Sequence, residues 1–191
     1  MINQIKTYIN SSIESKQLIL KDTKILEQIQ QISNEIVKAL KNDNKILFVG
    51  NGGSASDCDH LSTEFVSKFY KDRQAFNAIS LTSNNALITA LSNDFSYDKA
   101  FSRQIEAIGK KGDILFALST SGNSKNIIES INIANEMGLL TIGLTGITPC
   151  KMDDITKICL KIPSKETPII QESQMMLGHL ICKLAEDELL T

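Results

Sequence analysis

Five short apolar runs, separated by turns and helical patterns, are the feature that most restricts how this chain of 191 residues folds. The runs cover 46–49, 78–81, 114–118, 139–144 and 158–162. Continuous apolar runs of this length are typical of strands buried on both faces of a parallel sheet. Because helical patterns lie between them, the expected fold is α/β, a three-layer α/β/α sandwich with a five-stranded parallel sheet. The fifth run alternates apolar and polar residues, which predicts an edge strand.

Helical periodicity accounts for the segments around these runs. Two helices are predicted within residues 2–43, and the second begins after an N-cap at Asp22. Its isoleucine stripe faces either the domain core or a partner subunit. The remaining helices are expected over 54–70, 84–92, 97–108, 124–137 and 168–190.

Punctuating residues refine these boundaries. Ser96 is the expected N-cap of the helix over 97–108, and Gly138 is the expected C′ glycine of the helix over 124–137. Residues 145–154 are expected to form a loop. No linker or repeat interrupts the pattern, so a single domain over 1–191 is predicted. Residues 1–43 would be a helical N-terminal extension that packs on this domain or on a partner subunit.

Charge and cysteine content exclude several classes of protein. The net charge is −2, so no surface for sequence-independent nucleic-acid binding is expected. No stretch reaches 18 apolar residues and the N-terminus lacks a continuous apolar segment, so we expect neither a membrane span nor a signal peptide. The four cysteines have no metal-binding spacing and are expected to be reduced, buried residues of a cytoplasmic protein.

Two loops at predicted strand ends carry an unusual density of glycine and hydroxyl residues. One is Gly50–Ser54, and the other is Ser119–Ser124. Ligands bind beyond the carboxyl ends of parallel strands, and a helix N-terminus presents free N–H groups to an anion. Glycine and serine are also ordinary turn residues, but their presence at two equivalent positions favours a ligand site. Four hydroxyl side chains in the second loop indicate a phosphate monoester.

Nucleotide-binding alternatives fit less well. Gly50, Gly52 and Ala55 satisfy the G-x-G-x-x-A fingerprint of dinucleotide-binding folds. That fingerprint needs an acidic residue at the end of the second strand, where this chain has Leu81-Thr82-Ser83. A Walker loop is excluded because no Gly-Lys-Ser or Gly-Lys-Thr triplet exists.

The chain has two histidines, and one has an acidic neighbour at helical spacing. His60 and Glu64 project from one helix face, about 40° apart, and can share a divalent metal or act as base and orienter. His179 lies in the predicted C-terminal helix, where a lone histidine is more often a satisfied core residue. Composition and spacing leave these alternatives open.

Taken together, the motifs resemble those of the phosphoheptose isomerase family, within the sugar isomerase (SIS) fold group. The resemblance rests on the run Gly50–Ala55 followed by His60 and Glu64. It continues through Asn93-Asp94-Phe95, Phe101–Gln104, Ser119–Ser124, Ile170-Gln171-Glu172 and His179. It implies a flavodoxin-like SIS fold. It also implies conversion of sedoheptulose 7-phosphate to D-glycero-D-manno-heptose 7-phosphate through an enediol, the first step of nucleotide-activated heptose synthesis for lipopolysaccharide or capsule.

The resemblance also implies residue roles. The phosphate would be bound by Ser54, Ser119, Thr120, Ser121 and Ser124. The sugar would be lined by Asn51, Gly52, Gly53, Asn93 and Asp94, with Glu64 and Gln171 also in contact with substrate. One zinc ion per subunit would be held by His60, Glu64, Gln171 and His179. Glu64 and His179 match the acid–base pair, and the family is homotetrameric with active sites at subunit interfaces.

One geometric expectation concerns Gln171 and His179. Eight residues of a regular helix span about 12 Å, so these two side chains would struggle to meet at a single metal. Either Gln171 lies at a frayed helix start, or different subunits supply the ligands. We therefore predict an active site shared between subunits of a homo-oligomer.

Two positions depart from the family pattern, and two other classes of function remain open. Ile169 stands where the family usually has arginine, and Gln174 where it usually has histidine. The lost cation could alter substrate choice. A non-catalytic SIS protein of the kind that associates with the DnaA initiator is the main alternative, and a sugar-phosphate sensor is the second. Glu64 and His179 favour the enzyme, because a scaffold has no need of them.

Overall fold

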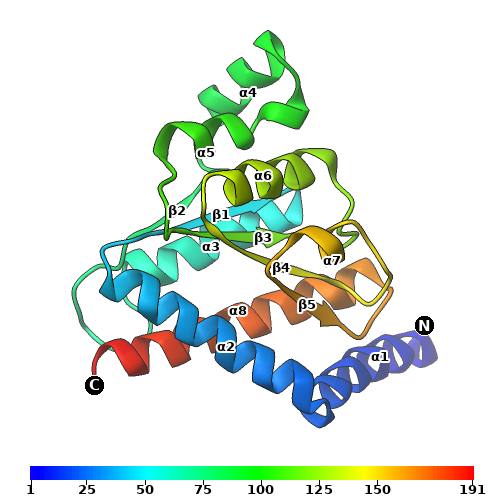
Figure 1. Ribbon diagram of the computed structural model, residues 1–191. Helices are drawn as coiled ribbons and strands as arrows, with labels where there is room; N and C mark the ends of the chain where they lie inside the picture. Colours follow the sequence, from blue (N-terminus) through cyan, green and yellow to red (C-terminus); the bar gives the residue numbers. More distant parts are fainter.

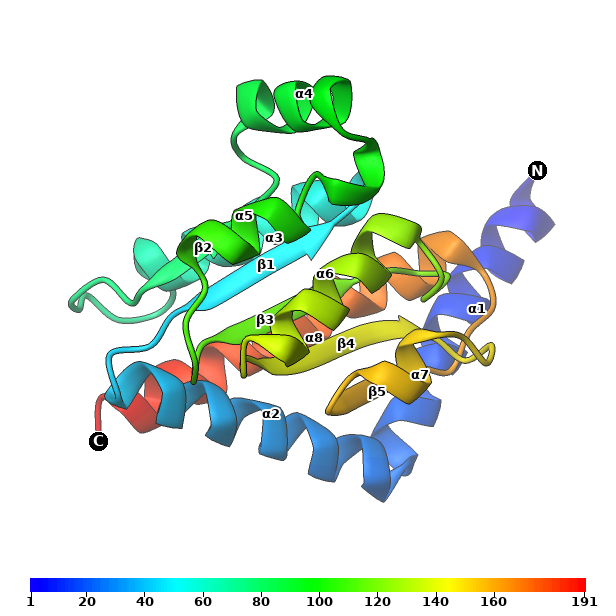
Figure 2. The same cartoon turned by 45° about the horizontal axis from the view of Figure 1, so that its top comes forward.

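The computed structural model covers residues 1–191 and contains one five-stranded parallel sheet. The strand order is β2-β1-β3-β4-β5, the flavodoxin-like order. Every neighbouring pair of strands is parallel, and Figure 2 shows β1 and β4 pointing the same way. The predicted sheet is thereby confirmed, and the strands are β1 (Ile46–Gly50), β2 (Ala78–Ser80), β3 (Ile114–Leu118), β4 (Leu140–Gly146) and β5 (Ile158–Ile162).

Helices cover both faces of the sheet and complete the three layers (Figure 1). On one face lie α2 (Thr23–Lys41), α3 (Gly53–Val66) and α8 (Thr167–Leu189). On the other face lie α5 (Ser102–Ile108), α6 (Lys125–Glu136) and α7 (Met152–Ile155). The remaining helical segments are α1 (Ile2–Lys21), α4 (Asn85–Asp94) and the 3₁₀ turn η1 (Tyr97–Lys99). No helix is both long and apolar enough to cross a membrane.

Burial explains why the apolar runs became strands. Every residue of β1 and β3 is buried, because the sheet separates two apolar clusters. The outer strand β5 alternates between buried and half-buried residues, which confirms the predicted edge position. Gly138, at φ +78°, follows α6 in the left-handed conformation expected of a C′ glycine.

Three boundaries differ from the sequence expectations. The helix expected over 54–70 ends at Val66. The loop expected at 145–154 is shortened at both ends, because β4 extends to Gly146 and pairs with β5, and α7 begins at Met152. The helix expected over 97–108 is split into η1 and α5, and Ser96 makes no side-chain cap. The break lets Phe101 enter the core, where it is fully buried.

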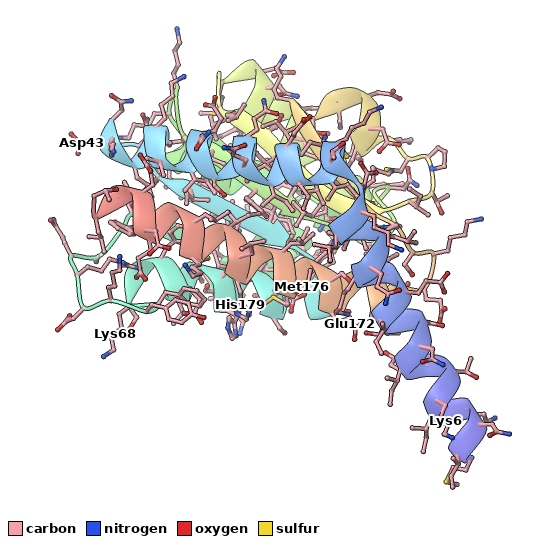
Figure 3. The ribbon with its side chains drawn as sticks, turned by 90° about the horizontal axis from the view of Figure 1, so that it is seen from below. Lys6, Asp43, Lys68, Glu172, Met176 and His179 are labelled. Carbon is pink, nitrogen blue, oxygen red and sulfur yellow. The ribbon has the colours of Figure 1, made fainter.

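The N-terminal helices behave differently from each other. Asp22 caps α2 as predicted, accepting hydrogen bonds from the N–H groups of Lys24 and Ile25. The isoleucine stripe of α2 joins the core of this chain. In contrast, α1 projects away from the body of the molecule, as Figures 1 and 3 show.

Candidate active site

The two glycine- and hydroxyl-rich loops meet at the carboxyl edge of the sheet. They lie side by side because β1 pairs directly with β3. A small cavity of about 60 Å³ lies between them and is lined by Asn51, Ser54, Leu118, Ser119, Thr120, Ser121 and Ser124. We call this set of residues the hydroxyl cradle. Helices α3 and α6 both begin beside it, so two helix N-termini add N–H groups to its hydroxyls.

Backbone geometry shapes the cradle. Gly52, the N-cap of α3, has φ +56°, and Gly122 has φ +63°, conformations that favour glycine. The hydroxyl of Ser119 accepts a hydrogen bond from the Gly122 N–H. A side chain at Gly122 would collide with the Cys150 thiol, because a Cβ there would lie 2.2 Å from Sγ. The Ser119–Ser124 loop is therefore held both by packing against Cys150 and by hydrogen bonds within the loop.

Asn51 links the cradle to residues that the sequence analysis missed. Its side-chain amide exchanges hydrogen bonds of 2.9 and 2.8 Å with Asn126, and it accepts one of 2.8 Å from the Tyr97 hydroxyl. Asn126 is the second residue of α6, two positions after Ser124, so its spacing from the second loop was the available signal. Nothing in the sequence indicated Tyr97, because the distance from residue 97 to Asn51 is set by the break between η1 and α5.

Asn93 and Asp94 are predicted substrate residues that lie on α4, outside the cradle. They end α4, are exposed, and hydrogen-bond to each other. Helix α4 stands away from the sheet in both ribbon views (Figures 1 and 2). Their role in substrate binding remains a prediction.

The other half of the site lies between α3 and α8, which run side by side in the same direction. Gly53, Asp57, His60 and Glu64 follow one another at helical spacing on one face of α3. The facing side of α8 presents Gln171 near Gly53, and His179 near His60. Close packing is possible because Gly178 has no side chain, since a Cβ there would lie 2.7 Å from Leu61.

His60, Glu64 and His179 form one cluster. The Nε2 atom of His60 lies 3.0 Å from a Glu64 carboxylate oxygen and 3.0 Å from Nε2 of His179. All three ligand atoms lie within 4.8 Å of one another. Figure 3 labels His179 on α8, at the point where this helix lies against α3. The sequence left two interpretations of His179. The interpretation as a core residue is wrong, because the imidazole is half-buried and lies beside the polar side chains of His60 and Glu64.

Gln171 lies two helical turns before His179, as the geometric expectation required. It is the fifth residue of α8 and thus not at a frayed start. A Cβ at Gly53 would lie 1.9 Å from its amide nitrogen, so glycine is needed for this close approach. Asp57, a residue missed by the sequence analysis, lies one turn before His60 on α3, and one of its carboxylate oxygens is buried without a hydrogen-bond partner. Burial raises the pKa of Asp57, against the opposing effects of Gln171 and His60.

The donor set fits a zinc ion. Zinc takes imidazole nitrogen and carboxylate oxygen ligands at about 2.0–2.2 Å, which places ligand atoms of a tetrahedral site about 3.3 Å apart. The two 3.0 Å separations around His60 are close to that value. Three of the four predicted ligands are therefore assembled within one chain, and Gln171 belongs to the same α3–α8 contact.

The two departures from the family pattern lie in the interior. Ile169 and Gln174 are buried, and the Gln174 amide donates a 2.7 Å hydrogen bond to the Leu144 carbonyl. Gln174 thus supports the end of β4, and Ile169 places an apolar side chain where the family usually has a cation.

Comparisons with known proteins agree with this architecture. A family model for the SIS domain matches residues 7–146. The chain is 46% identical over 187 residues to the phosphoheptose isomerase of Aneurinibacillus thermoaerophilus, which covers 98% of this chain and 94% of that protein. It is 47% identical over 189 residues to that of Clostridium acetobutylicum, covering 99% and 96%. The fold matches the phosphoheptose isomerase structure from Neisseria gonorrhoeae with a TM-score of 0.90 and 34% identity, covering 97% of this chain and 98% of that one.

The sheet order, the hydroxyl cradle and the family match define a SIS-domain protein. The similarity along nearly the whole chain narrows this class further. The chain belongs to the phosphoheptose isomerase family, as its motifs indicated. These relatives do not favour the non-catalytic alternative.

Proposed function

We propose that this chain is an aldose–ketose isomerase that converts sedoheptulose 7-phosphate to D-glycero-D-manno-heptose 7-phosphate. The observation that carries the proposal is the His60–Glu64–His179 cluster beside the hydroxyl cradle, in a member of the phosphoheptose isomerase family. The cradle supplies hydroxyl and N–H donors for a phosphate, and the cluster supplies a carboxylate and imidazoles for proton transfer.

The spacing of the two regions suits the length of a heptulose phosphate. Ser54 and His60 are six residues apart on α3, which is about 9 Å along the helix axis. Seven bonds separate phosphorus from the carbonyl carbon of sedoheptulose 7-phosphate, which is roughly 8 Å when the chain is extended with bonds of about 1.5 Å. Phosphate in the cradle therefore brings the carbonyl end toward the cluster.

Isomerisation moves a proton between C1 and C2 through a cis-enediol. In this proposal Glu64 takes the proton from C1 and returns it to C2, because a half-buried carboxylate can act as a general base. His179 moves a proton between the two oxygen atoms. Asn51, Gly52, Gly53, Asn93, Asp94 and Gln171 are proposed to contact the sugar, and Ser54, Ser119, Thr120, Ser121 and Ser124 the phosphate.

We further propose that His60, Glu64, Gln171 and His179 hold one zinc ion per subunit. When bound, zinc stabilises negative charge on a substrate oxygen as a Lewis acid. Calorimetry with zinc alone tests the site: His60→Ala is expected to weaken binding by at least about 10- to 100-fold, because it removes a direct ligand and even the loss of a group that only orients a ligand costs that much. Equal affinity of the wild type and His60→Ala would contradict this ligand set.

The proposed assembly is a homotetramer with active sites at subunit interfaces. The support is an exposed apolar stripe on α1, formed by Ile2, Ile5, Ile9 and Ile13. From the middle of the same helix, Ser12 and Lys16 bond Glu172, the neighbour of Gln171. Figure 3 labels Glu172 where α8 lies near α1. A subunit seated on the stripe would come close to the site. Light scattering of Ile5→Glu/Ile9→Glu should show dissociation with loss of activity, and a fully active monomer would contradict the shared site.

The proposed biological setting is the cytoplasm, where the product feeds nucleotide-activated heptose synthesis for surface polysaccharide. All four cysteines are unpaired, and a reducing compartment favours that state.

The experiment that tests the proposed activity is direct. Purified protein is incubated with sedoheptulose 7-phosphate and zinc, and formation of the aldose is followed by ¹³C NMR. The expected result is an equilibrium mixture of ketose and aldose, reached from either sugar. No turnover by folded, zinc-loaded protein would overturn the assignment.

A further inference from the structure

A buried ion pair joins α8 to the segment that follows α3. The side chains of Arg73 and Glu186 are both 2% exposed, and Arg73 Nε lies 2.8 Å from the Glu186 carboxylate. Glu186 lies two helical turns after His179 on α8, and Arg73 follows Glu64 by nine residues. The pair therefore stands behind the cluster, at the ends of both elements that carry it.

Arg73 holds the end of α3. Its guanidinium donates hydrogen bonds of 2.8 Å to the Glu64 carbonyl and 2.9 Å to the Phe65 carbonyl. Carbonyls in the last helical turn have no partner within the helix, so these bonds fix where the turn carrying Glu64 ends. The planar fork of arginine can reach both carbonyls and Glu186 together, which a lysine ammonium cannot. The ring of Phe76, 4.0 Å from the guanidinium carbon, supports the same orientation.

Glu186 holds the segment beyond α3. Its carboxylate accepts hydrogen bonds from the backbone N–H groups of Phe69, Tyr70 and Lys71, in addition to Arg73. This places the Phe69 ring on His179, with ring centroids 5.7 Å apart and planes inclined by 24°. Phe69 thus contacts one imidazole of the cluster while Arg73 fixes the helical turn that carries its carboxylate.

We propose that Arg73 and Glu186 are positioning residues that set the geometry of Glu64 and His179, an inference that rests on the proposed isomerase function. Stability alone does not account for the pair, because buried ion pairs are often no more stabilising than apolar residues of similar volume. The network instead links the Glu64 backbone, which Arg73 bonds, to the Phe69 ring, which lies against His179. The Glu186 carboxylate joins these two parts. Misplacement of reacting groups by about 1 Å can reduce a rate by about 10²-fold.

The test compares Arg73→Met, Arg73→Lys and Glu186→Gln with Lys45→Met. Lys45 forms a second buried ion pair, 2.6 Å from Asp113, where β1 and β3 begin, at the end of the strands opposite to the cradle. It is the matched control for loss of stability. We expect kcat for sedoheptulose 7-phosphate to fall about 10- to 100-fold in the first three variants, with KM within about twofold because the cradle lies at the other end of α3. Lys45→Met should keep the wild-type kcat at a melting temperature comparable with those of the other three variants. Arg73→Lys should not restore kcat.

A spectroscopic readout separates this inference from the proposed activity. The chain has two histidines, so their imidazole resonances can be assigned by NMR with the His60→Ala variant. Arg73→Met and Glu186→Gln should shift the His179 resonances, and so should Phe69→Leu, which removes the ring and leaves the ion pair intact. These shifts are expected even if sedoheptulose 7-phosphate is not the substrate. Unchanged His179 resonances, or a loss of kcat no larger than in Lys45→Met, would overturn the positioning role.

Discussion

The two halves of the site, at the two ends of α3, are built in different ways. The hydroxyl cradle uses backbone and short side chains from loops that directly follow β1 and β3. The His60–Glu64–His179 cluster uses long side chains from two helices that are far apart in the sequence. The cradle is thus held by the sheet, whereas the cluster depends on how α3 and α8 pack. We expect cradle changes to weaken substrate binding and cluster changes to slow the chemical step.

The largest effect should come from the cluster. Glu64→Gln and His179→Ala are each expected to lower kcat about 10²- to 10⁴-fold, because each removes an acid–base group. KM should change little, since the cradle is untouched. Steady-state kinetics check this. Substantial activity in both variants would show that the cluster is not the acid–base pair.

A cradle substitution should give the opposite kinetic pattern. Ser124 precedes α6 as its N-cap and makes no side-chain capping bond, so Ser124→Ala removes a hydroxyl with little effect on the loop. We expect KM to rise about 10- to 100-fold with kcat nearly unchanged, because a hydrogen bond to a charged group contributes about 1.5–3 kcal/mol. Ser33→Ala is the control, since that buried hydroxyl bonds the Ile29 carbonyl in α2. A fall in kcat with constant KM would break the division between the two regions.

Gly53 opens α3 next to the cradle and contacts Gln171, a proposed zinc ligand, so it connects the two regions and sharpens the comparison. Gly53→Ala places a methyl group against the Gln171 amide, so zinc affinity in calorimetry is expected to fall about tenfold, as when a group orienting a metal site is disturbed. Gly52→Ala is the matched control. A Cβ there meets nothing within 4 Å, but the φ of +56° makes alanine strained by about 1–2 kcal/mol. It should lower the melting temperature and spare zinc binding. The reverse pattern would contradict the Gly53–Gln171 contact.

The smallest effect concerns the support behind the cradle. Burial alone would raise the pKa of Asp153, but hydrogen bonds from Lys161 and Cys150 lower it from 3.8 to about 2. A depressed carboxyl pKa contributes stability above the unfolded value, and this contribution is lost as the pH falls from about 4 to 2. Asp153→Asn should therefore cost about 1–2 kcal/mol at pH 7 and reduce the loss of stability between pH 4 and pH 2. Urea unfolding across that pH range measures it, and an unchanged acid dependence would contradict the role of Asp153.

The difference between the regions also explains what could be predicted from the sequence. Strands and cradle follow from local patterns, because a buried parallel strand needs a continuous apolar run and its loop is the next segment of chain. The contact between His60 and His179 joins residues 119 positions apart and depends on packing around Gly178. No local pattern specifies such a contact, and only the family resemblance predicted it. Tyr97, Asp57 and the Arg73–Glu186 pair were missed for the same reason.

The most direct test of the central claim follows a carbon-bound proton. Sedoheptulose 7-phosphate is incubated in D₂O with wild type or Glu64→Gln, and deuterium at C1 of the ketose and C2 of the aldose is measured by NMR. If Glu64 takes the proton from carbon as a base, that proton exchanges with D₂O in part of the turnovers, so wild type should introduce carbon-bound deuterium as the aldose forms. Glu64→Gln should show neither product nor label. Conversion by Glu64→Gln at the wild-type rate would contradict the account.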